Sequence, residues 1–310
     1  MALLTIFTAP KPFIAPHIKV IQRNALKNWL ALGDEVEVLV IGDDPGVSEV
    51  CVELGVRHLP GVECNEQRTP LISSIFTLAR EASTSPFLAY ANADIIFLPD
   101  ILDAVRLMAS QQDRFLAVGQ RWDLDIRDPI AFEGDWANRL KWRIETDGKL
   151  HGQTGSDYFI YPRACFKDIP DFAVGRAGWD NWMIFRARWN HWPVIDATEM
   201  VTVLHQNHDY RHLPNGQIHY RLPESSENIR IGGGRRTIFN LTDATHRLVG
   251  GTLEKQPLDK GSFCREAEIF PLVGLRSRAL GWLSFALFHP SKAFTEFKEW
   301  LVRTLRASRR

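Results

Sequence analysis

Two kinds of segment alternate along the first hundred residues of the chain. Short runs rich in β-branched and aromatic residues have the composition of buried strands, and the longer stretches between them carry apolar residues at helical spacing. The predicted strands are Leu3–Phe7, Val36–Ile41, Val56–Leu59 and Phe87–Ala91. The predicted helices are His17–Leu32, Val47–Leu54, Leu71–Ala82 and Ile101–Ala109. This alternation predicts an α/β fold in which helices flank a mixed, mostly parallel sheet.

The pattern becomes irregular after Phe115. The apolar runs Phe115–Val118, Tyr158–Tyr161 and Val194–Leu204 predict strands, and Trp179–Trp189 predicts a helix. Residues 212–261 are rich in Gly, Pro, Ser and Asn, which is typical of loops. We therefore expect an α/β domain over residues 1–210, a loop-rich segment over 211–268 and a basic helical extension over 269–310.

The charges of the whole chain cancel, with 37 Lys and Arg against 37 Asp and Glu, so no basic excess points to nucleic acid. Basic residues are concentrated at the C-terminus, where Leu272–Arg310 holds eight basic and two acidic residues. The four cysteines are far apart and form no C-x-x-C motif, which favours a reducing compartment. The apolar start Met1–Phe7 has no basic flank and reaches Pro10 at once, so it predicts a strand instead of a signal peptide. The expected location is the cytoplasm.

The C-terminal extension suits a membrane surface better than a membrane span. The apolar stretch Ile269–Phe288 contains Arg276 and Arg278, and its uncharged part is about 15 Å long as a helix, roughly half of a hydrocarbon core. After Pro290, apolar residues recur at helical spacing while basic residues lie off that stripe, as in helices that bind anionic membranes. The apolar residues are Phe294, Phe297, Leu301 and Leu305, and the basic ones are Arg303 and Arg306. We expect peripheral association with the inner face of a membrane; packing of this helix on the body is the alternative.

Two polar residues close the fourth predicted strand. Asn92 and Asp94 follow Phe87–Ala91 and precede another apolar run. Ligands of parallel sheets bind at the carboxyl ends of the strands. Alternate residues of an extended chain point the same way, so this pair could offer one oxygen to a ribose hydroxyl and another to a divalent cation. A simple turn that uses Asn and Asp for backbone hydrogen bonds is the alternative.

The segment Asn92-Ala93-Asp94 resembles the D-x-D motif of GT-A fold glycosyltransferases of the family 2 type, which use nucleotide sugars. The resemblance covers Leu3 to Tyr210. It implies that Asp94 coordinates Mn²⁺ or Mg²⁺ on the donor diphosphate and that Asn92 contacts the ribose or the metal. Because Asn replaces the first Asp of the motif, the metal would have one carboxylate fewer. The implied activity is transfer of a sugar from a nucleoside diphosphate sugar to a glycan or lipid-linked acceptor.

The resemblance also assigns the loops that hold the donor nucleotide. Thr8, Ala9 and Pro10 follow the first predicted strand, at the place where the family holds the nucleoside. Asp43 and Asp44 follow the second strand, where an acidic residue hydrogen-bonds the base or ribose. Capping of the helix that starts near Val47 is the alternative role for these two carboxylates.

Two further loops are candidates for the diphosphate and the metal. Arg68 precedes Pro70 at the start of a predicted helix, and both a guanidinium and a helix N-terminus favour anions; a solvated surface arginine is the alternative. His205 and His208 follow a predicted strand, at the position where the resemblance implies a histidine ligand to the metal. Imidazole is an adequate ligand for Mn²⁺.

Two carboxylates are candidates for the catalytic group. Asp180 lies in the first turn of a predicted helix after Gly175 and Gly178, and it resembles the family's acceptor-side carboxylate. In an inverting reaction it would remove the proton of the acceptor hydroxyl, whereas a helix-stabilising carboxylate is the alternative role. Asp157 precedes the strand Tyr158–Tyr161 and is the second candidate, beneath the anomeric carbon in a retaining reaction.

Three other functions remain open from the sequence. A nucleotidyltransferase would use a similar sheet and cation. His205, His208 and His212 would share one face if the segment were helical, and could then bind Zn²⁺ in a hydrolase. The β-branched run Val201–Leu204 argues for a strand there instead. A non-catalytic carbohydrate-binding or scaffold protein is the third alternative, and it leaves Asn92 and Asp94 without a purpose.

Overall fold

A computed structural model describes residues 1–208 and 222–307. Its core is a nine-stranded sheet with the strand order β13-β12-β10-β6-β9-β4-β1-β2-β3. Only β9 and β13 run antiparallel to their neighbours, so the predicted mixed, mostly parallel sheet is confirmed. The strands are β1 (Leu4–Thr8), β2 (Val36–Ile41), β3 (Arg57–Leu59), β4 (Phe87–Ala91), β6 (Leu116–Val118), β9 (Tyr158–Pro162), β10 (Val194–Asp196), β12 (His246–Val249) and β13 (Thr252–Lys255).

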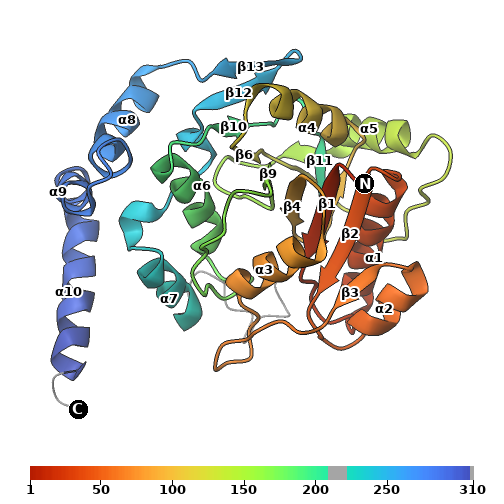
Figure 1. The fold of residues 1–310 in the computed structure, drawn as a ribbon, viewed down its shortest axis with the longest axis horizontal. Helices are drawn as coiled ribbons and strands as arrows, with labels where there is room; N and C mark the ends of the chain where they lie inside the picture. The colour runs from red at the N-terminus through yellow and green to blue at the C-terminus, as the bar shows by residue number, and fades with distance from the viewer. Residues whose placement is uncertain (209–221, 308–310) are drawn as a thin grey trace.

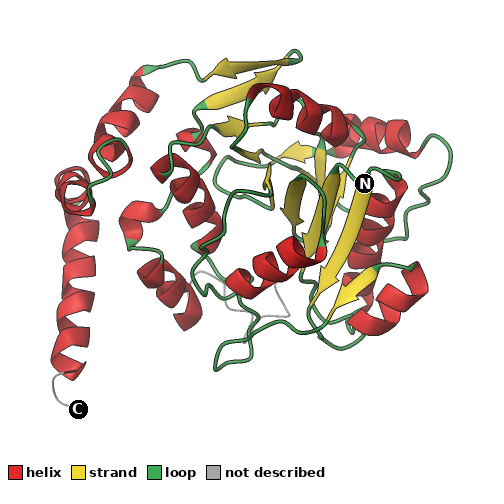
Figure 2. Cartoon of the chain, viewed as in Figure 1, coloured by secondary structure: helices red, strands yellow, loops and turns green. Residues whose placement is uncertain are grey.

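Helices cover both faces of this sheet (Figures 1 and 2). Alternate side chains of β1 point to opposite faces: Leu4 and Ile6 pack with α1, α2 and α4, whereas Phe7 packs with α3, α6 and α8. Both faces of β1 are therefore buried, as is usual for a central strand of a parallel sheet. The helices are α1 (Pro16–Ala31), α2 (Val47–Leu54), α3 (Ile72–Ala82), α4 (Asp100–Gln111), α5 (Trp136–Asp147), α6 (Trp179–Trp189), α7 (Pro223–Ile231) and α8 (Lys260–Val273).

A second sheet of four short strands lies beside the carboxyl edge of the main sheet, and the sequence did not predict it. Its order is β5-β11-β7-β8, with α5 packed on it through a third apolar cluster. These strands are β5 (Ile95–Phe97), β7 (Trp122–Leu124), β8 (Lys149–Leu150) and β11 (Val203–Gln206). Because β5 follows β4 after only three residues, the second sheet holds the Asn92–Asp94 segment from one side.

The prediction of one strand over Val194–Leu204 is wrong. The run is divided between β10 in the main sheet and β11 in the second sheet. Asp196 accepts hydrogen bonds from the backbone and the hydroxyl of Thr198, which makes a local turn, and Asp100 accepts one from the backbone N–H of Thr202. The hydrogen bonds to Asp196 and Asp100 stabilise a turn at a place where the β-branched residues alone would favour a continuous strand.

The segment expected to be loop-rich contains more regular structure than its composition predicted. Its described part holds α7, the short 3₁₀ helices η3 (Arg235–Thr237) and η4 (Leu241–Asp243), and the strands β12 and β13. β12 pairs with β10, so this segment completes one edge of the main sheet. The proposed division of the chain at residues 210 and 268 stays a prediction.

The C-terminal extension, predicted for residues 269–310, is helical and holds the last turn of α8 together with α9 (Arg278–Phe288) and α10 (Pro290–Ala307); α8 itself begins in the segment that was expected to be loop-rich. α9 packs on α8 and α10 packs on α9, so that α10 lies at the edge of the molecule, at the left in Figure 1. In the described part of the chain, no helix combines the length and the apolar character that crossing a membrane requires.

Candidate active site

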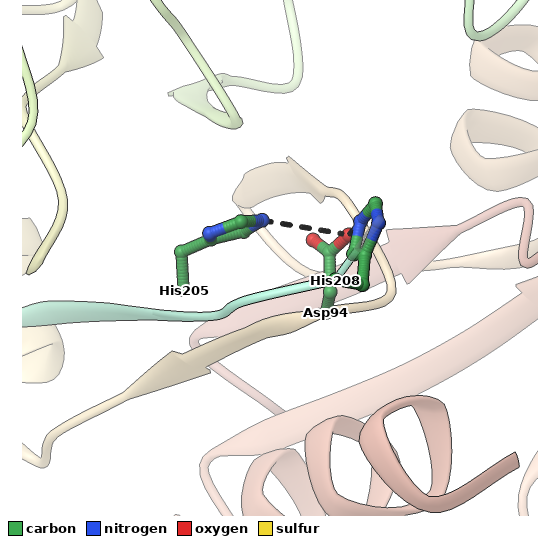
Figure 3. Close-up of side chains that lie close together, drawn as sticks. All are labelled: Asp94, His205 and His208. Carbon is green, nitrogen blue, oxygen red and sulfur yellow. Dashed lines mark hydrogen bonds and ion pairs between the residues drawn. The ribbon is translucent and has the colours of Figure 1, made fainter. Parts of the chain in front are cut away.

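Pairing between strands brings Asp94 next to two histidines. β5 is antiparallel to β11, with Ile95 opposite His205, so Asp94 lies at the end of that ladder. His208 Nε2 lies 3.0 Å from Asp94 Oδ2, and His205 Nε2 lies 3.9 Å from the same oxygen (Figure 3). One donor atom from each of the three residues lies within 4.8 Å of the others. This Asp94–His205–His208 cluster therefore has the geometry of a metal site and contains the three residues predicted for that role.

The environment of Asp94 suits a bound cation. Its side chain is 12% exposed, and its Oδ1 atom is buried without a hydrogen-bond partner among the residues the structure describes. Burial by itself raises the pKa of this carboxyl, but the hydrogen bond with His208 and the charges of His205 and Lys11 outweigh it and hold the pKa well below its usual range. The group is thus an ionised carboxylate with a free oxygen, which a hard divalent cation would satisfy.

Asp123 supports His205 from the side away from Asp94. β7 pairs parallel to β11 with Asp123 directly opposite His205, and Asp123 Oδ1 lies 3.0 Å from His205 Nδ1. His151 Nδ1 lies 2.8 Å from the other oxygen of Asp123, and Arg121 Nε donates to Asp123 at 3.1 Å. Burial raises the pKa of Asp123, yet these bonds outweigh it and keep the pKa well below its usual range. Asp123 was not predicted from the sequence, because a single Asp in a three-residue strand forms no recognisable pattern.

Asn92 and Asp157 meet across two strands of the main sheet. β4 and β9 are antiparallel with Ala91 opposite Tyr158, so the next pair along this ladder is Asn92 and Asp157. The backbone N–H of Asn92 donates to the Asp157 carbonyl at 2.9 Å, and Asn92 Nδ2 donates to Asp157 Oδ1 at 2.9 Å. The other carboxylate oxygen of Asp157 forms an ion pair with Arg121. Through Arg121 and Asp123, both residues are connected to the Asp94–His205–His208 cluster.

Asp180 lies on the other side of Asn92, near Tyr90. The Tyr90 hydroxyl donates to Asn92 Oδ1 at 3.2 Å, and Trp179 packs edge-on against the Tyr90 ring at 5.0 Å. Burial is the main cause of the raised pKa of Tyr90, and the charges of Asp94 and Asp180 add to it. Asp94 and Asp180 therefore lie around the same phenol, at one edge of the sheet.

The start of α6 explains how Asp180 is held. Gly178 precedes the helix with φ of 107°, which a glycine adopts without strain, and its N–H donates to Asp180 Oδ1 at 3.2 Å. Asp180 thus stabilises the first turn of α6 and is still partly exposed. The two roles considered for this residue are compatible.

The first predicted donor loop follows β1. Thr8 is fully buried, and its Oγ1 has no hydrogen-bond partner in the described part of the chain. Pro10 is buried and Ala9 is half-buried. Lys11 follows, and its Nζ lies 3.4 Å from His208 Nε2. Lys11 connects this loop to the Asp94–His205–His208 cluster, although no sequence pattern had marked it.

The second predicted donor loop follows β2. Asp43 is exposed and Asp44 is half-buried. Burial and the charge of Asp43 raise the pKa of Asp44. The residue that precedes α2 is Gly46, and no side chain caps this helix. Neither aspartate has the capping role that was their alternative, so nucleotide contact stays a prediction for both.

The expected position of Arg68 at a helix N-terminus is wrong. α3 begins at Ile72, because Pro70 and Leu71 form isolated β-bridges with Cys64 and Ala173 and stay extended. Arg68 is exposed, with φ of 62°, on the loop before these bridges.

Glu224 of α7 ties this loop to the turn before α6. It accepts hydrogen bonds from Asn65 Nδ2 at 2.8 Å and from Arg176 Nε at 2.7 Å. Burial raises the pKa of Glu224, but the hydrogen bonds from Asn65 and Thr69 and the charged Arg176 outweigh it and lower the pKa overall. The contacts between α7, the loop that contains Asn65 and the turn that contains Arg176 could not be predicted from the sequence.

The helical arrangement of histidines required by the zinc hydrolase alternative is wrong. His205 lies in strand β11, so His205 and His208 do not share a helix face. His212 lies outside the residues that the structure describes. The third residue of the observed cluster is Asp94, which contributes a carboxylate.

Comparisons with known proteins found no matching family model and no matching curated protein. Among solved structures, the chain is similar to S. aureus TarS. It aligns with residues 1–349 of TarS in complex with UDP-GlcNAc at 15% identity and a TM-score of 0.45, covering 75% of this chain and 66% of that one. A longer TarS structure aligns at 15% identity and a TM-score of 0.45, with 39% of that chain covered. The chain thus spans slightly less than two thirds of the shorter TarS structure and well under half of the longer one.

Proposed function

We propose that this protein is a glycosyltransferase that moves a sugar from a nucleoside diphosphate sugar to a glycan or lipid-linked acceptor with the help of Mn²⁺ or Mg²⁺. The observation that carries the proposal is the Asp94–His205–His208 cluster at the carboxyl edge of a mostly parallel sheet. Open α/β sheets bind ligands at this edge. The buried, unpaired oxygen of Asp94 supports a cation at the position that the D-x-D resemblance implies.

The residues present fit a divalent cation. The carboxylate of Asp94 and a ring nitrogen of each of His205 and His208 would hold it, leaving further positions for phosphate oxygens. When bound, the cation offsets the negative charge that develops on the departing diphosphate. Asp123 accepts the Nδ1 proton of His205, which leaves the Nε2 lone pair directed toward the cluster. Asp123 is therefore a positioning residue in this proposal.

The donor would occupy the loops that follow β1 and β2. Thr8, with its unpaired buried hydroxyl, would bind the nucleoside together with Ala9 and Pro10. Asp43 or Asp44 would contact the base or the ribose. The ammonium of Lys11, next to His208, is placed to meet an anionic phosphate.

The roles proposed for Asn92 and Arg68 concern the ribose and the diphosphate. Asn92 already accepts from Tyr90 and donates to Asp157, so it would present a fixed amide to the ribose. The Arg68 guanidinium lies on an exposed loop and would meet the diphosphate from the solvent side. Substitution of Arg68 by Ala tests this role through the KM for the donor.

Asp180 is the proposed base for the acceptor hydroxyl. It lies in the first turn of α6, where the resemblance implies the carboxylate that faces the acceptor. In an inverting displacement, in which the acceptor attacks directly, Asp180 would remove the proton of the acceptor hydroxyl. The retaining alternative assigns the residue beneath the anomeric carbon to Asp157.

Two measurements test the proposed function. Thermal shifts with UDP-, GDP- and dTDP-sugars, with and without Mn²⁺, report donor binding, because a ligand that binds only the folded state raises its stability. We expect one nucleotide class to raise the melting temperature more strongly when Mn²⁺ is present, and failure of every donor would contradict the proposal. Product analysis separates the alternatives: a glycosyltransferase releases a nucleoside diphosphate, and a nucleotidyltransferase acting on sugar phosphates releases pyrophosphate.

A further inference from the structure

Exposed apolar side chains are concentrated on the two last helices. More than half of the large hydrophobic side chains that are exposed in the described chain belong to α9 and α10. Leu287 is 78% exposed and Phe294 is 59% exposed. Contiguous apolar surface of this kind marks a site of interaction. We call these residues the tail face: Leu280, Leu283 and Leu287 on α9, and Phe294, Leu301 and Leu305 on α10.

The acidic residues of α10 point toward the body of the protein. Glu299 pairs with Arg235 at 3.3 Å, and Glu296 lies 3.7 Å from Arg236. Both arginines belong to η3. The two contacts fix the rotation of α10 about its axis, because Glu296 and Glu299 lie on its side opposite Phe294 and Leu301.

A glycine makes this contact possible. Gly234 has φ of 93°, and a Cβ atom added to it would lie 2.0 Å from Glu296 Oε1. The glycine-rich sequence before Arg235, which had no role in the proposed active site, therefore lets the body approach α10 closely. The result is one fixed orientation of α10, with its acidic side inward.

Lys298 is the basic residue of α10 that lies beside the apolar stripe, with its Nζ 4.5 Å from the centre of the Phe294 ring. Within the described part of the chain, Lys298 forms no ion pair. Lys292 lies on the opposite side of the helix from Phe294. Arg276 is exposed just before α9, whereas Arg278 lines a pocket of the body. The tail face is thus an apolar surface with an uncompensated lysine, Lys298, at its edge.

We propose that the tail face binds the surface of an anionic phospholipid bilayer, with α10 lying in the plane of the interface. An apolar stripe would enter the boundary between headgroups and acyl chains, and lysine and arginine would meet the lipid phosphates. Charge complementarity favours this occupant over a second copy of the chain, because two tail faces packed together would bring the Lys298 ammonium of each copy into the same apolar interface. The inference goes beyond the proposed sugar transfer and does not depend on it.

The test is co-sedimentation of the full-length protein with vesicles of phosphatidylcholine, with and without phosphatidylglycerol. We expect binding to the vesicles that contain phosphatidylglycerol, weakened by salt. Leu301 is exposed in the free protein and would be buried in the membrane interface. Leu301→Glu removes this apolar side chain and adds a negative charge, so it should reduce partitioning onto the vesicles by at least about tenfold. Lys298→Glu should reduce it by about tenfold or more on anionic vesicles and leave the residual binding to phosphatidylcholine unchanged.

Trp142→Glu is the matched control. Trp142 is 64% exposed on α5, on the opposite side of the molecule from α10 (Figure 1), so this variant should bind vesicles as the unchanged protein does. Equal melting temperatures and equal donor thermal shifts show that each variant is folded. The proposal is overturned if the protein ignores anionic vesicles, or if Trp142→Glu loses binding as strongly as Leu301→Glu. It is also overturned if light scattering shows a dimer that Leu301→Glu dissociates while vesicle binding stays unchanged.

Discussion

Asp123 and His205 face each other on neighbouring parallel strands, with Asp123 Oδ1 3.0 Å from His205 Nδ1. This bond leaves Nε2 of His205 directed toward Asp94 Oδ2, 3.9 Å away. A histidine that ligates a metal commonly donates its other N–H to such a carboxylate. Asp123 therefore supports a proposed metal ligand without being one itself, and its role can be tested separately from the ligands.

Asp123→Asn should weaken Mn²⁺ binding by about 10–100-fold, because the His205 ring loses its charged acceptor. Isothermal titration calorimetry with Mn²⁺ measures this directly. Asp125→Asn is the control, since Asp125 pairs with Arg127 at the surface. Asp123 also binds His151 and Arg121, so the melting temperature of the variant must be measured as well. Unchanged Mn²⁺ affinity in a folded Asp123→Asn protein would show that Asp123 does not support a metal ligand.

Asp180→Asn should lower kcat by about 10²–10⁴-fold, because the amide cannot accept the proton of the acceptor. Donor and Mn²⁺ thermal shifts should persist, since Asp180 is not part of the Asp94–His205–His208 cluster. The amide oxygen can still accept the bond from Gly178, so α6 should remain folded. A variant that retains full activity would exclude Asp180 as the base and leave Asp157 as the candidate catalytic carboxylate.

Glu224→Gln should reduce the loss of stability at acid pH. The folded protein holds the pKa of Glu224 below its unfolded value, so the carboxylate stabilises the fold above the unfolded pKa, near pH 4. That stabilisation disappears as the pH falls through the lower, folded pKa. Melting temperatures of the variant between pH 7 and pH 3 should therefore fall less than those of the unchanged protein. Glu66→Gln, on an exposed loop residue, is the control. Identical pH profiles for Glu224→Gln and the unchanged protein would contradict this account.

Gly234→Ala should destabilise the protein by about 1–3 kcal/mol, because the added Cβ meets the Glu296 carboxylate and φ is positive. Gly33→Ala separates the two causes: Gly33 has a similar φ of 99°, and an added Cβ has nothing within 4 Å. Chemical denaturation of both variants measures the difference. If the two substitutions cost the same, the contact between Gly234 and α10 does not constrain the helix.

Apolar periodicity predicted the elements that form the main sheet. β1, β2 and β4 are mostly buried on both faces, and their sequences are correspondingly rich in apolar residues. The short strands β5 and β7 escaped prediction, because three residues carry too little pattern. Their positions depend on pairing with β11, more than eighty residues away along the chain from β7. Such pairings are decided by tertiary packing and not by local sequence.

The candidate site was predicted unevenly for the same reason. Asp94, His205 and His208 were marked by their positions after apolar runs, and the structure brings them together. Lys11 and Arg121 could not be predicted in this way, because each is a single charged residue in a loop or at a strand end and belongs to no sequence pattern. The prediction for Arg68 was wrong in one respect: Pro70 suggested the start of a helix, whereas Pro70 takes part in a β-bridge.

The most direct test of the central claim is anomalous diffraction from a crystal grown with Mn²⁺ and a nucleoside diphosphate sugar. The account predicts a manganese peak bounded by the Asp94 carboxylate and a ring nitrogen of each of His205 and His208, in contact with the diphosphate. A bound nucleotide with no manganese at these three atoms, or manganese bound elsewhere on the chain, would contradict it.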